Sequence, residues 1–171
     1  YDYIITEYNN GIDLPIKLST YSEVPIGTGL GSSSTLTVVI LKAFDKFLNL
    51  GFDNYELAEL AFKVERVICN LAGGKQDHYS SAFGGMNHFT FNKNFTKANK
   101  LVLENWFVAE LEASMILHYT GQSRHSDTII KEQSKGLKSK NDYNFKKMHL
   151  LCEESLKMKE YLLTSNFNGV I

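Results

Sequence analysis

The sequence predicts an α+β protein. One segment alternates with the two-residue period of a strand, and a glycine-rich turn then leads directly into a segment with helical spacing. Further strand-like and helix-like segments follow without the strict strand-helix-strand alternation of a parallel fold. At 171 residues, 43% of them hydrophobic, the chain can bury a sizeable core.

The first strand and the first long helix flank the glycine-rich turn. Apolar or small polar residues alternate with larger polar ones over 16–24, which predicts a strand. After Gly31 a run of hydroxyl side chains can cap a helix that should run to about Leu48. Its apolar positions fall at helical spacing: Leu36, Val39, Ile40, Ala43, Phe44 and Phe47.

A second helix begins after a short connection, with Asp53 or Asn54 as its cap. Glu65 lies toward its C-terminal end. The pair Gly73-Gly74 then breaks the chain, and 76–83 is expected to form a short helix. The apolar positions of the second helix are Leu57, Leu60, Ala61, Val64, Val67 and Ile68.

The second half is less regular. The turn Gly84-Gly85 precedes a strand-like stretch at 86–91, and 93–100 is either a surface loop or a weak hairpin. A short apolar run at 113–119 has strand length, and 126–135 resumes helical character. A long amphipathic helix is indicated by Met148, Leu151, Cys152, Leu156, Met158, Tyr161 and Leu162.

Composition excludes several classes of function. Lys and Arg total 18 against 19 Asp and Glu, so we expect neither nucleic acid nor an anionic membrane as a partner. No apolar stretch approaches the ~20 residues that cross a bilayer, and no secretory signal opens the chain, so we expect a cytoplasmic protein. Cys69 and Cys152 are predicted to be reduced and mostly buried thiols. The sequence carries no signal for a particular oligomeric state.

The strongest chemical signal is the loop 25–34, Pro-Ile-Gly-Thr-Gly-Leu-Gly-Ser-Ser-Ser, which runs into a predicted helix. A helix N-terminus presents unpaired N–H groups and partial positive charge to an anion, and glycines let the backbone approach phosphate oxygens. The loop is not a Walker A motif, because no Lys precedes its last Ser. It therefore predicts a phosphate-binding loop of another kind.

Two carboxylates could complete a phosphoryl-transfer site. Glu65 lies on a helix and Asp77 follows a Gly-rich turn, a spacing that can bring both around one centre. Phosphoryl transfer needs a metal ligand and a group that positions or deprotonates the attacking hydroxyl. Taken alone, Glu65 beside Arg66 is better interpreted as a solvated helix residue, and Asp77 could be a helix cap.

The loop resembles the second, diagnostic motif of the GHMP kinases, the galactokinase, homoserine, mevalonate and phosphomevalonate kinases. Their pattern is a Pro followed by Gly-x-Gly-Leu-Gly-Ser-Ser, and the resemblance implies ATP and Mg²⁺ as cofactors. By similarity, Ser33 and Glu65 match the Mg²⁺ ligands and Asp77 the catalytic Asp. The implied ATP phosphate-binding residues are Gly27, Gly29, Leu30, Gly31, Ser32, Ser33 and Ser34.

The resemblance also implies the fold and its domains. The GHMP kinase fold has helices packed on mixed or antiparallel sheets and a left-handed crossover in its N-terminal domain. Residues 1–108 would form the C-terminal portion of that ATP-binding and catalytic domain, and 109–171 the incomplete start of the C-terminal domain. The N-terminal substrate motif and the C-terminal glycine-rich motif of the family are absent, and the chain opens without Met, so we expect a piece of a longer protein.

Within the family, the sequence resembles bacterial D-glycero-D-manno-heptose 7-phosphate kinases. The similarity rests on Gly-Lys-Gln-Asp at 74–77 and on Thr-Gly-Gln-Ser-Arg at 120–124. It implies phosphorylation of the anomeric hydroxyl of a sugar phosphate, on the route to nucleotide-activated heptose for surface polysaccharide. Lys75, Gln76 and Arg124 are the expected substrate-binding residues, because Arg suits bidentate phosphate recognition. His78 departs from the pattern, where Gln is usual.

Two alternatives stay open. A galactokinase- or fucokinase-like enzyme would share the loop and the carboxylates but act on a free sugar. A catalytically silent regulator could use the same loop to bind a nucleotide or a sugar phosphate, although a binding module has no need of Asp77.

Overall fold

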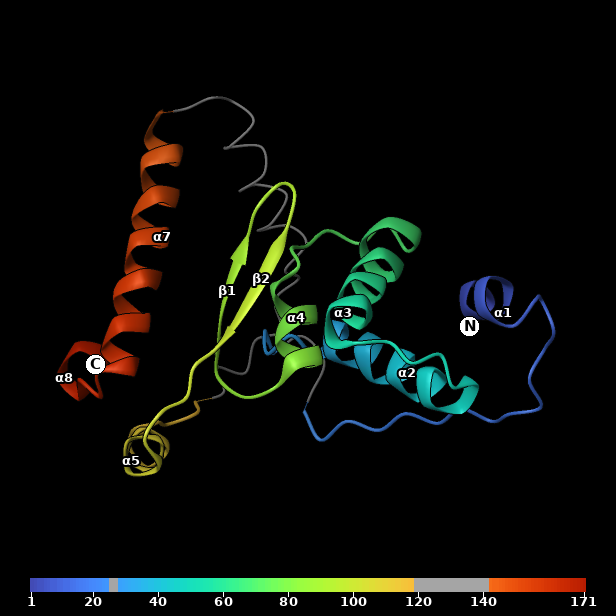
Figure 1. The fold of residues 1–171 in the computed structure, drawn as a ribbon, viewed down its shortest axis with the longest axis horizontal. Helices are drawn as coiled ribbons and strands as arrows, with labels where there is room; N and C mark the ends of the chain where they lie inside the picture. Colours follow the sequence, from blue (N-terminus) through green and yellow to red (C-terminus); the bar gives the residue numbers. More distant parts are fainter. Residues whose placement is uncertain (25–27, 119–141) are drawn as a thin grey trace. The chain divides into compact units, whose positions relative to one another are not determined.

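The computed structural model describes residues 1–24, 28–118 and 142–171 (Figure 1). Contacts divide the described chain into two compact units between Gly84 and Gly85. The domain boundary expected at residue 108 lies elsewhere. It describes the domains of the larger family fold, and it stays a prediction. The candidate site lies wholly in the first unit.

The first unit is helical. Its elements are α1 (Asp2–Tyr8), α2 (Ser32–Leu48), α3 (Asn54–Phe62), a π-helical turn η1 (Lys63–Ile68) and α4 (Gln76–Phe83). The predicted helices at 32–48 and 76–83 are confirmed. The expected hydroxyl cap of the first helix does not form, and its expected apolar face is wrong: Leu36, Val39 and Phe47 are exposed, because the helix packs on its neighbours through Val38, Leu41 and Phe44. The helix at the N-terminus was not anticipated from the sequence.

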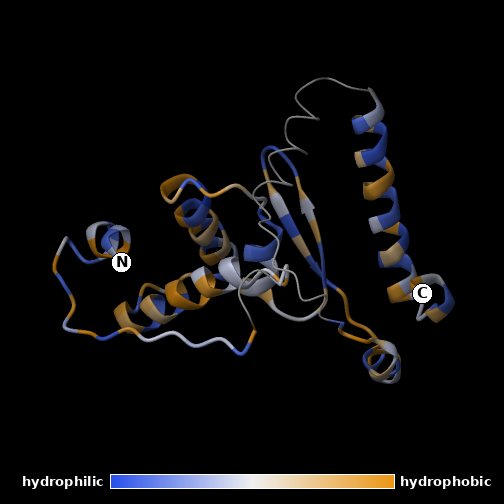
Figure 2. Ribbon diagram, turned by 180° about the vertical axis from the view of Figure 1, so that it is seen from behind, coloured by the Kyte–Doolittle hydropathy of each residue, from blue (hydrophilic) through white to orange (hydrophobic). Residues whose placement is uncertain are grey.

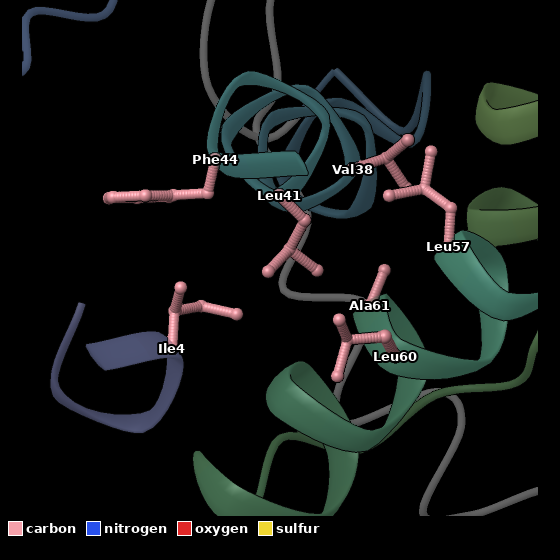
Figure 3. Close-up of a cluster of buried hydrophobic side chains, with 7 residues drawn as sticks. All are labelled: Ile4, Val38, Leu41, Phe44, Leu57, Leu60 and Ala61. Atoms are coloured by element: carbon pink, nitrogen blue, oxygen red, sulfur yellow. The ribbon is translucent and has the colours of Figure 1, made fainter. Parts of the chain in front are cut away.

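The core of this unit lies between α1, α2 and α3. Figure 3 shows apolar side chains from these helices converging on a common interior. Apolar residues dominate α2 in the hydropathy view as well (Figure 2). The buried cluster comprises Ile4, Val38, Leu41, Phe44, Leu57, Leu60 and Ala61.

A buried carboxylate closes the connection between α2 and α3. Asp45 accepts hydrogen bonds from Lys42 Nζ at 2.8 Å and from the backbone N–H of Phe52 at 2.9 Å. The hydrogen bond from Lys42, followed by the one from Phe52, holds the pKa of Asp45 below its ordinary value. Asp53 then begins α3 with a capping box, in which its side chain and that of Glu56 each accept the other's backbone N–H.

The described part of the second unit contains a hairpin followed by helices: β1 (Asn87–Phe91), β2 (Thr96–Lys100), α5 (Asn105–Ser114), α7 (Asp142–Leu163) and α8 (Phe167–Val170). β1 and β2 are antiparallel, with Phe89 opposite Ala98, which confirms the hairpin alternative for 93–100. Phe107 of α5 is buried and meets Phe167 of α8 edge to face. The long amphipathic helix is confirmed as α7, where polar and apolar residues alternate in Figure 2.

Two predicted strands do not form. Residues 16–24 are irregular, and Ile16, Leu18 and Tyr21 are exposed. Alternation alone does not make a strand, which needs a paired neighbour for its N–H and C=O groups, and no described segment pairs with this one. The run at 113–119 instead ends α5 and continues as exposed, irregular chain to residue 118.

Other expectations from the sequence have mixed outcomes. Cys69 and Cys152 are free thiols, as expected, but both are exposed rather than buried. The helix predicted at 126–135 lies outside the described residues. Within the described part of the chain, no helix combines the length and apolarity needed to span a membrane. With helices and an antiparallel hairpin, the α+β class is confirmed.

Leu41→Ala is expected to destabilise the whole protein by about 2–5 kcal/mol, because Leu41 is 3% exposed at the centre of the α1–α3 core. Val39→Ala is the matched control, since Val39 lies on the same helix but is 57% exposed. Its cost should stay within about 0.5 kcal/mol. Denaturant unfolding measures both, and equal losses would contradict the core assignment.

Asp45→Asn should cost stability at neutral pH and progressively less in acid. Because the pKa of Asp45 is lowered in the folded state, its contribution is present above the unfolded-state pKa and is lost as pH falls through the folded-state value. The free energies of unfolding of wild type and variant should therefore converge below about pH 4. A difference that stays constant from pH 7 to pH 3 would show that the charge of Asp45 plays no part.

Candidate active site

The N-terminus of α2 is open to an anion. Gly31 is the N-cap, with a left-handed φ of 70°, and no side chain caps the helix there. α3, by contrast, has its N-terminal N–H groups capped by a full capping box. Unpaired N–H groups and the positive end of the helix dipole therefore face the glycine loop. Leu30 is exposed beside it, and Gly27 lies outside the described residues.

Two successive serines of α2 hold the same carboxylate. Ser33 Oγ donates to Glu65 Oε1 at 2.5 Å, and Ser34 Oγ donates to Glu65 Oε2 at 2.8 Å. Ser33 is exposed, whereas Ser34 is buried. The structure thus brings together Ser33 and Glu65, the pair predicted as metal ligands. The hydroxyl of Ser34 is directed at Glu65, so only its backbone N–H remains for its expected phosphate contact.

A π-helical turn places Glu65. At the end of α3 the helix widens to the i→i+5 pattern, in which Cys69 N–H donates to Val64 C=O at 2.9 Å. Such turns occur as short insertions and are frequent at functional sites. Glu65 is 3% exposed, so this helix residue is not solvated.

His78 of α4 provides a further hydrogen bond to this carboxylate. Its Nε2 lies 2.6 Å from Glu65 Oε2, and its side chain is wholly buried. Burial raises the pKa of Glu65, but hydrogen bonds from Ser33 and Ser34 outweigh it and the net pKa is lowered. Burial lowers the pKa of His78 despite the neighbouring carboxylate. A neutral His78 therefore donates through Nε2 to an ionised Glu65.

Arg66 links the carboxylate to the glycine turn. Its Nη2 donates to Ser34 Oγ at 3.1 Å and its Nη1 donates to the C=O of Ala72 at 2.9 Å. The guanidinium also lies 3.7 Å from Glu65 Oε2. A Cβ at Gly73 would come within 2.2 Å of the Arg66 guanidinium carbon, so any side chain there would require Arg66 to move.

Asp77 reaches the loop from α4. It lies in the first turn of that helix and is exposed. A Cβ on Gly31 would lie 3.2 Å from Asp77 Cγ, so the carboxyl group packs directly against the N-cap of α2. Gly31 therefore serves both the left-handed turn and the approach of Asp77. Gln76 begins α4 and is exposed.

Of the two cations predicted to bind the substrate, only Lys75 lies among the described residues. Lys75 is paired with Glu59, its Nζ lying 2.6 and 2.9 Å from the two carboxylate oxygens, and it lies over the Phe62 ring. A substrate phosphate would have to compete with Glu59 for this cation. Arg124 lies outside the described residues.

Sequence reasoning missed Arg66 and His78. Neither residue is assigned a role from the sequence, whereas both contact Glu65. Adjacent charges on a short helix look the same in sequence whether they face water or the interior. The only available signal was the position of His78 directly after Asp77.

The oxygen ligands present suit a hard cation. A Ser hydroxyl and a carboxylate are ligands that Mg²⁺ accepts, with phosphate oxygens and water completing its shell. Ser33 Oγ and Glu65 Oε1 lie 2.5 Å apart, close enough for both to serve one cation. Among the described residues, no group of three or more His, Cys, Asp or Glu side chains is placed to bind a metal without such help.

Gly73→Ala should displace Arg66 and weaken its bonds to Ser34 and Ala72. We expect a loss of about 1.5–3 kcal/mol, the range for hydrogen bonds to charged groups. Gly74→Ala is the matched control, because no atom lies within 4 Å of a Cβ there. Thermal and denaturant unfolding of both variants of the whole protein test this. Equal stabilities would mean that Arg66 moves without losing its bonds.

Comparison with known proteins places this geometry in a family. Residues 1–85 match the GHMP kinases N terminal domain. D-glycero-alpha-D-manno-heptose 7-phosphate kinase of Campylobacter jejuni is 41% identical over 155 residues, covering 90% of this chain and 45% of that protein. A mevalonate kinase of Thermococcus onnurineus is 30% identical over 115 residues, covering 67% of this chain and 31% of that protein. The chain thus spans less than half the length of these curated relatives.

Solved structures agree. A candidate sugar kinase from Campylobacter jejuni superposes with a TM-score of 0.72 at 35% identity, over 98% of this chain and 47% of that one. A D-glycero-D-manno-heptose 1-phosphate kinase from Bacteriodes thetaiotaomicron gives a TM-score of 0.69, also at 35% identity, over 87% and 42%. Together with the loop, the paired serines and the two carboxylates, these matches show that the chain belongs to the GHMP kinase family.

Proposed function

We propose that the protein transfers the γ-phosphoryl group of ATP, with Mg²⁺, to the anomeric hydroxyl of D-glycero-D-manno-heptose 7-phosphate. One observation supports this above the rest. Ser33, Glu65 and Asp77 come from three separate elements, yet all converge on the N-terminus of α2. A site for phosphoryl transfer needs this combination of an anion cradle, a metal-binding pair and a carboxylate.

The phosphates of ATP would bind where α2 begins. Glycines 29 and 31 both have left-handed φ angles, 78° and 70°, which turn the loop so that successive N–H groups can face one anion. The N–H groups of Ser32 and Ser33 extend this cradle into the helix. Because no side chain of the described residues caps the helix, a phosphate would not have to displace a side-chain cap.

Ser33 and Glu65 would hold Mg²⁺ beside this cradle. When bound, the ion neutralises charge on the β- and γ-phosphate oxygens. Glu65 is suited to this because hydrogen bonds keep it ionised despite its burial.

Asp77 would act on the sugar hydroxyl. As the sugar oxygen bonds to the γ-phosphorus, the bond from phosphorus to the β–γ bridging oxygen breaks and ADP leaves with its electron pair. The hydroxyl proton passes to the Asp77 carboxylate, which is exposed and lies against Gly31. Asp77 therefore combines orientation of the nucleophile with general-base catalysis.

Similarity to the Campylobacter heptose 7-phosphate kinase supports the substrate. We place the reaction in the cytoplasm, where ATP is available. The free-sugar alternative differs in one physical requirement, because a sugar phosphate needs a cation near its phosphate and a free sugar does not. To meet that requirement, the Lys75 ammonium group must leave Glu59, its ion-pair partner, for the substrate phosphate.

Asp77→Asn should lower kcat by about 10²–10⁴-fold, because the amide cannot accept the hydroxyl proton. Binding of ATP should change little, since the phosphate cradle is untouched. Coupled ADP release by the whole protein gives kcat, and nucleotide titration gives the affinity. Asp2→Asn, an exposed Asp at the start of α1, is the matched control. Turnover equal to wild type in Asp77→Asn would remove Asp77 from this role.

A substrate panel tests the reaction itself. ADP release should require ATP and Mg²⁺ and should be fastest with heptose 7-phosphate, compared with galactose, fucose and mevalonate. Preference for a free sugar would support kinase activity but contradict heptose 7-phosphate as the substrate. ATP binding without turnover on any acceptor would favour the silent regulator.

A further inference from the structure

The two oxygens of Glu65 have different surroundings. Oε1 has one described partner, the hydroxyl of Ser33, which lies on the exposed side of α2. Oε2 accepts from Ser34 at 2.8 Å and from His78 at 2.6 Å, with Arg66 at 3.7 Å. One oxygen therefore faces the candidate metal position, and the other is directed into the protein.

We propose that Ser34 and His78 are positioning residues that retain Oε2 inside the protein, so that Glu65 offers a single oxygen to the cation and the site disfavours Ca²⁺ relative to smaller octahedral ions. This inference rests on the proposed function, because it assumes that Ser33 and Glu65 hold the metal.

The selectivity follows from the coordination preferences of the two ions. Ca²⁺ takes six to eight oxygen ligands and commonly uses both oxygens of one carboxylate. Mg²⁺ requires six ligands in a near-ideal octahedron and binds protein carboxylates sparingly. A carboxylate limited to one free oxygen meets the second requirement and not the first.

The interior side of this arrangement is costly to disturb. Ser34 and His78 are buried, and Ser34 also accepts a hydrogen bond from Arg66. The chain of donation runs from Arg66 through Ser34 to Glu65. Rotating Oε2 toward a cation would leave the Ser34 hydroxyl and the His78 N–H buried without an acceptor, and each such loss is unfavourable.

His78 is held in one orientation. Its ring is enclosed and meets Phe62 edge to face. Its second nitrogen, Nδ1, is buried with no hydrogen-bond partner among the described residues. Among the described residues, the ring therefore makes its side-chain hydrogen bond through Nε2, to Glu65. This bond fixes the direction of the N–H group.

The test measures metal preference rather than turnover. Mn²⁺, an EPR-visible octahedral ion, is titrated into the whole protein with ADP present, against a protein-free ADP blank, and Ca²⁺ is then added as competitor. Ser34→Ala removes one hydrogen bond to Oε2, and His78→Leu removes the other. His78→Gln keeps an N–H donor and serves as the conservative rescue.

Ser34→Ala and His78→Leu should each bind Mn²⁺ about 10-fold more weakly and should shift the competition toward Ca²⁺. His78→Gln should stay close to wild type. Ser33→Ala is the matched control: it removes the hydroxyl on Oε1, so it should weaken Mn²⁺ and Ca²⁺ together and leave their ratio unchanged. If His78→Leu fails to fold, the Mn²⁺ to Ca²⁺ preference of Ser34→Ala tests the proposal by itself, because that change removes only a hydroxyl.

The outcomes separate the two proposals. An Mn²⁺ to Ca²⁺ preference that is the same in wild type and Ser34→Ala overturns the positioning role and leaves the metal site standing. Absence of any Mn²⁺ binding by wild type with ADP overturns the metal site of the proposed function and this inference with it. A ratio altered equally by Ser33→Ala and Ser34→Ala also overturns the distinction between the two oxygens.

Discussion

The arrangement of the candidate site depends on one buried carboxylate. Glu65 is ionised and 3% exposed, and a buried charge without partners is strongly unfavourable. Its partners come from different parts of the chain: Ser33 and Ser34 from α2, and His78 from α4. Satisfying this one group therefore fixes the relation between α2, η1 and α4, and with it the approach of Asp77 to Gly31.

The apolar core and this polar network have separate roles. Leu41, Leu57 and their neighbours bury apolar surface between α1, α2 and α3, which stabilises the unit but tolerates small shifts. Hydrogen bonds to Glu65 are directional, so they select one register among the packings that the core allows. Arg66 extends the same constraint to the glycine turn at 72–73, from which the chain proceeds to Asp77.

Helices were predictable where their signals were local. The capping box of Asp53 marks the start of α3, whereas the hydroxyl run after Gly31 lies at the start of α2 without capping it. Apolar spacing predicts the buried face of α3 but not that of α2, where Val38 and Leu41 are buried and Val39 is exposed. The strand expected at 16–24 shows the limit, because pairing depends on a distant segment and alternation alone cannot supply it. The π-turn at η1 was equally hidden, since widening of a helix leaves no mark in composition.

The sequence by itself determined the chemistry available: a glycine loop before a helix, hydroxyl side chains at its start, and two carboxylates at a family-like spacing. Only the tertiary structure decided how these groups are used. It exposed Ser33 and buried Ser34, assigned each to a different oxygen of Glu65, and made Arg66 and His78 partners of that carboxylate. The reason is physical: residue type sets which bonds a side chain can make, but burial and the positions of distant partners decide which of them form.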